Sequence, residues 1–212
     1  MSELTTFALL CFTSFFTILN PIGVMPVFMT MTAELDSAAK TKTARKAAIT
    51  SFVTMLTFAF TGKLLFQFFN ISVDSFRVVG GIIFFSMGYE MLQARLSRMK
   101  VSEEDVRQYV TDISITPLAI PMICGPGAIT NSIVLMESAQ SIEKKAVLIA
   151  MMALVNLIVF VILWGSSGIS KALGDTGNKI LMRLMGLIMM VIAVEFFFSG
   201  LRPILQSIFK IK

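Results

Sequence analysis

Two short motifs interrupt apolar runs with residue types that could bind a zwitterion. The first is Asn20-Pro21-Ile22-Gly23, and the second is Gly125-Pro126-Gly127. A proline inside a helix lacks the N–H donor and clashes with the carbonyl four residues earlier, while glycine lets the chain turn. Each motif therefore frees backbone groups, and Asn20 adds an amide that donates and accepts hydrogen bonds. Free N–H groups at a helix start suit a carboxylate, and free carbonyls suit an ammonium group.

Membrane helices are the elements that must position these motifs. The chain has 212 residues, of which 56% are hydrophobic and only 15% are charged. Apolar segments of about 20 residues are long enough to cross a bilayer, and helices satisfy their own backbone there. We therefore predict an all-α integral membrane protein with one domain over 1–212. Six segments are expected to span the membrane: 4–30, 47–69, 77–94, 116–136, 146–166 and 181–200.

The composition argues against several other functions. The net charge is +5, but the basic residues lie mostly between and beside apolar runs, where they orient helices rather than bind nucleic acid. The sequence contains no histidine, which disfavours a histidine metal site or a serine–histidine hydrolase. It also has no phosphate-binding Gly-x-x-x-x-Gly-Lys loop for direct use of ATP. We expect no enzyme activity, no cofactor and no bound metal.

Basic residues are concentrated at the first, third and fifth connections between the apolar segments. Such a bias places those connections in the cytoplasm and both termini outside. Eleven of the 18 lysines and arginines contribute to it: Lys40, Lys42, Arg45, Lys46, Arg95, Arg98, Lys100, Arg107, Lys171, Lys179 and Arg183.

The two halves of the sequence match weakly at offsets of 105 and 106. Asn20-Pro21 aligns with Gly125-Pro126 at an offset of 105, as Glu90 does with Glu195, and Arg77 aligns with Arg183 at 106. Repeats of about 1–106 and 107–212 would each hold three helices, so they would lie in opposite orientations. Inverted repeats of this kind place substrate where broken helices meet near mid-membrane. Chance matches in an apolar sequence remain the alternative.

Other polar residues could line or gate a pathway. Thr13 and Thr17 share one face of the first segment with Asn20, although threonines also hold membrane helices together. Glu90 and Glu195 could gate or relay protons, or could lie solvated at the membrane interface. Gly80, Gly81 and Gly88 are typical of close helix packing. For each broken segment, an ordinary proline kink is the alternative to a binding site.

The sequence resembles the MarC family, also called the neutral amino acid transporter family. The resemblance covers nearly the whole chain and depends most on "NPIGVMPVFMTMT" at 20–32 and "PLAIPMICGPGAIT" at 117–130. It implies a six-helix membrane protein of bacteria or archaea that transports small neutral amino acids. The family's motif residues correspond here to Asn20, Pro21, Gly23, Pro26, Pro117, Pro121, Gly125, Pro126 and Gly127.

These observations together favour a secondary transporter or exporter of small neutral amino acids in the cytoplasmic membrane, coupled to protons or sodium. The alternatives are a membrane thiol–disulfide electron carrier using Cys11 and Cys124, or an accessory subunit without transport. The sequence leaves the oligomeric state open. The predicted substrate site consists of Asn20, Pro21, Gly23, Gly125, Pro126, Gly127 and Asn131.

Overall fold

The computed structural model describes residues 2–93 and 106–209, and all regular structure in these ranges is helical. The chain forms α1 (Glu3–Leu19), α2 (Pro21–Met31), α3 (Ser37–Phe68), α4 (Val73–Leu92), α5 (Val106–Ile113), an irregular segment η1 (Ser114–Ile123), α6 (Pro126–Ser138) and α7 (Ile142–Phe209). Helical turns in η1 are interrupted at Thr116 and Ile120. Gly174 is non-helical within α7, with φ 63° and ψ −176°. It separates a first arm, Ile142–Ser166, from a second arm, Thr176–Phe209.

Several helices begin where a short polar side chain can cap them. Ser2, Asp36 and Ser72 precede α1, α3 and α4, and each accepts a hydrogen bond from the backbone N–H three residues later. Each cap satisfies one of the donors that a helix start leaves free, and is worth about 1 kcal/mol. These helix boundaries are therefore encoded locally in the sequence.

Within the described residues, four helical stretches are long and apolar enough to cross a membrane: Glu3–Met31 (α1 with α2), Ser37–Phe68 and the two arms of α7. The bent pair Val110–Ile123 and Pro126–Ser138 could form a fifth span, with a bend of 61° at the break. The predicted class, an all-α membrane protein, agrees with these spans. Six spans are not confirmed, because α4 lies outside this group and carries Asp74, Arg77 and Glu90 within its twenty residues.

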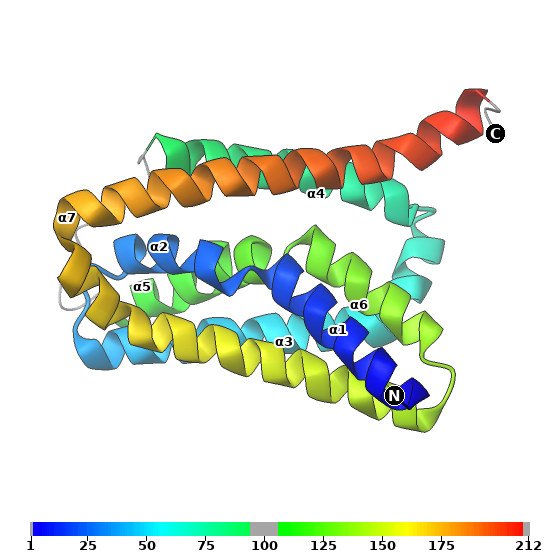
Figure 1. The fold of residues 1–212 in the computed structure, drawn as a ribbon, viewed down its shortest axis with the longest axis horizontal. Coiled ribbons are helices and arrows are strands. Elements are labelled where there is room, and N and C mark those ends of the chain that lie inside the picture. The colour runs from blue at the N-terminus through cyan, green and yellow to red at the C-terminus, as the bar shows by residue number, and fades with distance from the viewer. Residues whose placement is uncertain (1, 94–105, 210–212) are drawn as a thin grey trace.

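Helix α4 and the second arm of α7 lie side by side along one edge of the molecule, at the top of Figure 1. We call them the α4–α7 pair. Glycines bring their backbones together: a methyl group added to Gly186 would lie 2.7 Å from the carbonyl oxygen of Gly88. A methyl group added to Gly81 would lie 2.8 Å from the carbonyl oxygen of Ala193. The close-packing role expected of Gly80, Gly81 and Gly88 agrees with these contacts, since small residues let membrane helices approach closely.

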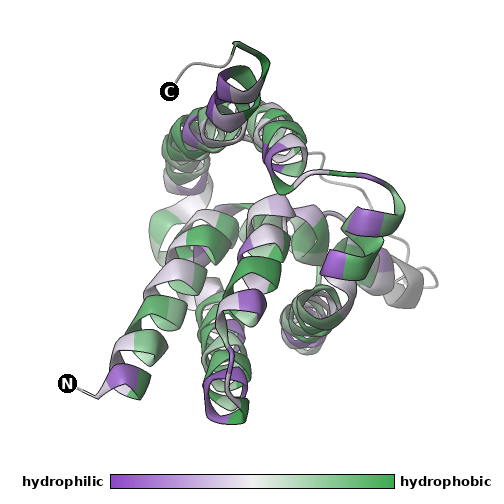
Figure 2. Cartoon of the chain, turned by 90° about the vertical axis from the view of Figure 1, so that its right-hand side faces the viewer, coloured by the Kyte–Doolittle hydropathy of each residue, from purple (hydrophilic) through white to green (hydrophobic). Residues whose placement is uncertain are grey.

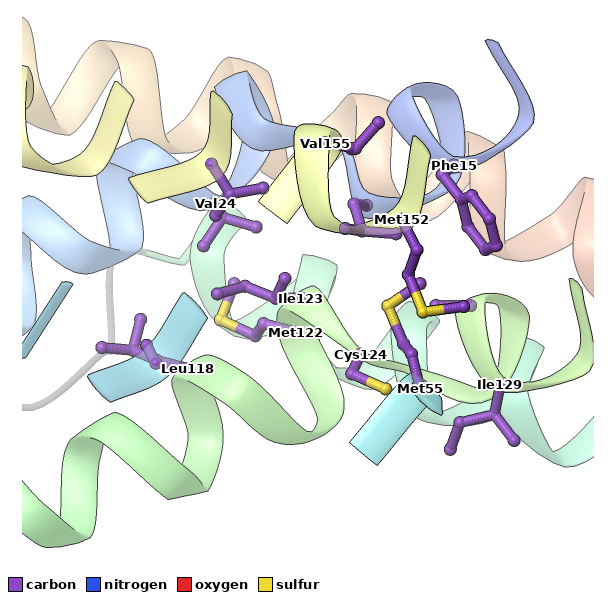
Figure 3. Packing of buried hydrophobic residues seen from close by; sticks show 14 of the residues in the cluster. Phe15, Val24, Met55, Leu118, Met122, Ile123, Cys124, Ile129, Met152 and Val155 are labelled. Carbon is purple, nitrogen blue, oxygen red and sulfur yellow. The ribbon is translucent and has the colours of Figure 1, made fainter. Parts of the chain in front are cut away.

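The remaining helices enclose a buried apolar core (Figure 3). Helix α1 contributes the residues of one face, at intervals of four: Phe7, Cys11, Phe15 and Leu19. Against them pack Met55 of α3, Met152 of α7 and Ile123 of η1, all fully buried. In a bilayer such a core is held by close packing rather than by the exclusion of water, because lipid tails are as apolar as leucine.

The outer surface is also apolar, as the hydrophobic residues on the outward faces of the helices in Figure 2 indicate. Phe68, Leu64 and Val191 are 81%, 68% and 65% exposed. Water-soluble monomers rarely expose apolar surface so widely. A hydrocarbon environment around the helices accounts for it.

Both termini lie at the same end of the long axis, on the right of Figure 1. This arrangement is compatible with the predicted topology, in which both termini lie on one side of the membrane. Arg95, Arg98 and Lys100, which contribute to the basic bias, lie outside the described residues. The outside location of the termini therefore stays a prediction, as does the inverted repeat.

Candidate functional site

Asn20 separates α1 from α2 and adopts a left-handed conformation, with φ 42° and ψ 63°. Asparagine tolerates this region better than most residues. Its Oδ1 accepts a hydrogen bond of 3.2 Å from the N–H of Gly23 and so caps α2. Pro21 occupies the first helical position, where its missing N–H costs nothing to α2. The same proline leaves the carbonyl of Thr17, in the last turn of α1, without its usual helical donor.

The second break lies between η1 and α6. Gly125 is the residue that precedes α6, Pro126 takes the first helical position, and no side chain caps this helix start. The N–H groups of Gly127 and Ala128 belong to the first turn, where an α-helix leaves donors free. Upstream, Thr116 and Ile120 are extended, as residues before proline prefer to be. The start of α6 is thus a buried set of donors that the chain itself leaves open.

The two breaks meet near the middle of the molecule. A methyl group added to Gly127 would lie 3.1 Å from Cγ2 of Ile18, which is in the last turn of α1. In Figure 1, α2 and α6 run from this region towards opposite ends of the long axis. The N-terminus of each helix carries a partial positive charge, so both direct positive potential to the same place. Gly127 of the second motif thus lies beside the last turn of α1, directly before Asn20, and a shared substrate site at the two motifs stays a prediction.

Two buried polar groups on α6 have no hydrogen-bond partner among the described residues. They are Oγ1 of Thr130 and Nδ2 of Asn131, and Thr130 is only 2% exposed. Residues three and four positions apart share a helix face, so both side chains lie one turn beyond Pro126 and Gly127. Buried polar groups are nearly always hydrogen-bonded, and exceptions need an explanation. A polar ligand at the start of α6 would supply one.

A small cavity adjoins Asn20. It is lined by Ile18, Leu19, Asn20, Val24, Phe84, Met122, Met189 and Ile192. The volume of the cavity is about 10 Å³, roughly what one water molecule needs. The region between the two breaks is therefore closed in this structure.

The α4–α7 pair covers the start of α6. A methyl group added to Gly80 would lie 2.5 Å from Cβ of Pro126, and one added to Gly127 would lie 3.2 Å from Cζ of Phe196. Phe84 and Phe196 are not among the predicted site residues. Nothing in their sequence context distinguishes them from the other phenylalanines, because their position depends on tertiary packing. Thr130, by contrast, belongs to the motif at 117–130 and could have been chosen from it.

The residues predicted to line or gate a pathway lie elsewhere. Thr13 and Thr17 are on the exposed face of α1, and Thr13 Oγ1 donates a 2.8 Å hydrogen bond to the carbonyl of Leu9. Glu90 and Glu195 are exposed on α4 and the second arm. None of these four lines the small cavity. Their predicted roles stay predictions, separate from the site at the two breaks.

Cys11 and Cys124 are both free and fully buried. Cys124 directly precedes Gly125 and lies in the buried cluster with Met55 and Met152 (Figure 3). Cys11 lies on the buried face of α1. Both thiols occupy positions typical of small apolar residues.

Long apolar helices, an apolar outer surface and two helix starts that meet inside the fold define an integral membrane protein. The family described as "MarC family integral membrane protein" matches residues 5–205. The chain therefore belongs to the MarC family, as the motifs at both breaks predict.

The relatives of this chain span bacteria and archaea. A UPF0056 membrane protein of Pyrococcus abyssi (strain GE5 / Orsay) is 40% identical, covering 95% of this chain and 97% of its own length. UPF0056 membrane protein YvbG of Bacillus subtilis (strain 168) is 38% identical, with coverages of 92% and 96%. UPF0056 membrane protein YhcE of Escherichia coli (strain K12) is 30% identical, with 93% of each chain covered. No solved structure matches the chain.

Asn20 caps α2 and is also predicted to bind substrate, and two variants separate these roles. Asn20→Ala removes the cap of α2, at about 1 kcal/mol, and leaves in the left-handed region a residue without the short polar side chain that lets asparagine adopt it. Asn20→Gly also removes the amide, but it keeps the backbone conformation and costs only a few tenths of a kcal/mol as a cap. We expect the glycine variant to retain nearly normal thermal stability and the alanine variant to lose it measurably.

Both variants are nevertheless expected to lose substrate binding to a similar extent, because both lack the amide. Binding is measured on the purified variants by ligand-induced thermal stabilisation. Normal binding by Asn20→Gly would show that Asn20 only shapes the break.

Proposed function

We propose that this chain is a secondary transporter or exporter of small neutral amino acids across the cytoplasmic membrane of a bacterium or archaeon. One observation carries the proposal: the uncapped start of α6 meets the Asn20 break beside the unpartnered hydroxyl of Thr130. Family membership supports a membrane function. Helix starts buried at mid-membrane are where many transporters bind the charged groups of their substrates.

The two ends of an amino acid have complementary partners at this place. The carboxylate would accept hydrogen bonds from the N–H groups of Gly127 and Ala128, aided by the dipole of α6. The hydroxyl of Thr130 and the Nδ2 of Asn131 would supply further donors. The ammonium group would be held by carbonyls that the break leaves free, such as that of Thr17. This arrangement uses no charged side chain, which suits a substrate of zero net charge.

The closed packing favours small side chains. Buried glycines and prolines form both breaks, and the residual cavity has room for about one water. Even glycine needs more space, so binding requires the walls to move apart. A proton or sodium gradient would drive the cycle between states open to either side.

Flux into proteoliposomes tests the proposal directly. The purified chain is reconstituted and supplied with labelled glycine, alanine, serine, threonine, leucine, glutamate and lysine, under imposed proton or sodium gradients. We expect the small neutral amino acids to move faster than in protein-free liposomes, and glutamate and lysine not to. If no member of the panel moves under either gradient, the proposed transport is wrong and the accessory-subunit alternative gains.

The thiol–disulfide alternative gains no support from the positions of Cys11 and Cys124, since both thiols are fully buried. We expect the double variant Cys11→Ala, Cys124→Ala to keep roughly half or more of the wild-type flux, because a buried cysteine acts as a small apolar residue. The flux assay above measures this. Complete loss of activity in a variant of normal thermal stability would instead favour electron transfer through the two thiols.

A further inference from the structure

The side chain of Phe84 stands over the start of α6, at a place where the proposed function requires space. We propose that Phe84 is the residue that sets the upper size limit of the substrate, and that it does so as part of a wall moving with the α4–α7 pair. This inference rests on the proposed function for the identity of the substrate. The position of the ring and its attachment to the pair are independent of that function.

The contact between Phe84 and the break is direct. A methyl group added to Gly125 would overlap Cε1 and Cζ of the Phe84 ring, and would lie 2.6 Å from the carbonyl oxygen of Pro121. Phe84 is 5% exposed and also lines the small cavity next to Asn20. The ring therefore contacts Gly125 at one break and lines the cavity that adjoins Asn20 at the other.

Helix α4, which carries Phe84, packs so closely against the second arm that we expect the two helices to move together. Four residues further along α4, a methyl group added to Gly88 would lie 2.9 Å from the carbonyl oxygen of Gly186 in the second arm. Near the start of α4, the carbonyl oxygen of Asp74 would lie 2.5 Å from a methyl group added to Gly200 of the second arm. Backbone contacts along the whole length of α4 leave little freedom for it to move without the second arm. Phe196 on that arm flanks Gly127, so both aromatic rings must shift together.

The α4–α7 pair contacts the start of α6 through side chains rather than through backbone atoms. These contacts consist of side chains against Pro126, Gly125 and Gly127, and within the described parts of the chain no backbone hydrogen bond joins these residues to the pair. Apolar surfaces of this kind separate more readily than interlocked backbones. Moving the pair away would expose the donors of α6, while the Phe84 ring would still form one side of the opened space.

The size limit follows from the volume of the ring. Replacing phenylalanine with alanine in a packed core leaves a cavity, because the surroundings collapse only partly. At Phe84 that cavity would adjoin the place proposed for the substrate side chain. Phe84→Ala should then admit leucine, and Phe84→Trp should exclude even threonine.

Transport ratios test this inference. In proteoliposomes we expect Phe84→Ala to raise leucine flux relative to alanine flux by at least about tenfold, since each added methylene in a pocket is worth roughly 10–200-fold. Phe85→Ala is the matched control, because Phe85 follows Phe84 on α4 but is 42% exposed. Phe85→Ala should leave the ratio unchanged. An unchanged ratio for Phe84→Ala, or an equal change in both variants, overturns the size limit.

A second readout does not depend on which substrate moves. Cys124 precedes Gly125 and is fully buried, so it reports access to the break. In a Cys11→Ala background, we expect Phe84→Ala to raise the labelling rate of Cys124 by a small membrane-permeant thiol reagent at least about tenfold, as opening of a closed site should. Phe85→Ala should not do so. Phe84→Leu replaces the alanine variant if the latter is unstable.

The two readouts separate this inference from the proposed function. Faster Cys124 labelling without flux of any amino acid would support Phe84 as the closing residue and count against amino acid transport. Alanine flux with an unchanged substrate ratio and unchanged labelling would support transport and overturn the role of Phe84.

Discussion

Gly127→Leu is expected to abolish transport while leaving the protein assembled in the membrane. The β-carbon alone would lie 3.1 Å from Ile18 and 3.2 Å from Phe196, and the rest of the leucine would fill the space proposed for the carboxylate. Gly127→Ala should be milder, because these neighbours are side chains that can shift by a few tenths of an ångström. We expect a partial loss for alanine, and for leucine a loss of at least about a hundredfold in flux, as for a misplaced group at a reacting or binding centre.

The control for Gly127→Leu is the same substitution at a glycine of a membrane helix that has no close neighbours. A methyl group added to Gly165, in the first arm of α7, would have no neighbouring atom within 4 Å, so Gly165→Leu should transport normally. Thermal stability of each purified variant separates a blocked site from a misfolded protein. Normal transport by a stable Gly127→Leu protein would place the substrate elsewhere.

Gly186→Leu is expected to have the largest effect on stability. Its β-carbon would lie 2.7 Å from the carbonyl oxygen of Gly88 and 2.8 Å from the backbone nitrogen of Leu92. Backbone atoms cannot move aside as side chains do, so α4 and the second arm would have to separate. Overpacking in well-packed interiors usually costs about 1–3 kcal/mol, occasionally more, and this site belongs at the upper end.

Expression in membranes and thermal unfolding in detergent measure the effect. Gly168→Leu is the control on the same helix, since no atom lies within 4 Å of its added methyl group. The control should accumulate and melt as the unaltered protein does. Equal stability of the two variants would contradict the close backbone contact between α4 and the second arm.

The parts of the site that sequence analysis anticipates depend on local chemistry. Pro21 and Pro126 cannot sit within a continuous helix, and both prefer its first position. Asn20 is one of the few residues that accept a left-handed conformation. Two such interruptions in apolar runs are visible in the sequence, and so is their common offset of 105. In the fold, Gly127 of the second break lies beside Ile18, two residues before Asn20.

The parts that sequence analysis misses depend on packing between distant segments. Phe84 and Phe196 become wall residues only because α4 and the second arm lie against α6. Thr130 attracts notice only once its burial without a partner is known, whereas Asn131 is already among the predicted site residues. Thr13 and Thr17 lie on one face of α1, but helical periodicity does not say whether that face is turned inward or outward.

The charged residues of α4 explain why its prediction as a membrane span stays unconfirmed. The sequence predicts that segment 77–94 spans the membrane, and α4 covers nearly the same residues. Its two ends carry charge, however, and Arg77 forms a 3.0 Å ion pair with Asp74 that is partly buried. Polar residues of this kind make a helix a poor span by itself. Packing against the second arm compensates in the folded protein.

The pairing of α4 with the last helix has a consequence for synthesis. The ribosome completes α4 first and then makes α5, η1, α6 and the first arm of α7 before the second arm emerges. At about 5–20 residues per second, this delay is on the order of ten seconds. During this delay the second arm, against which the glycines of α4 pack, has not yet been made. Helix α4, which has charged residues at both ends, would then be exposed to lipid. We therefore expect the insertion machinery, rather than lipid, to hold α4 until the chain is nearly complete.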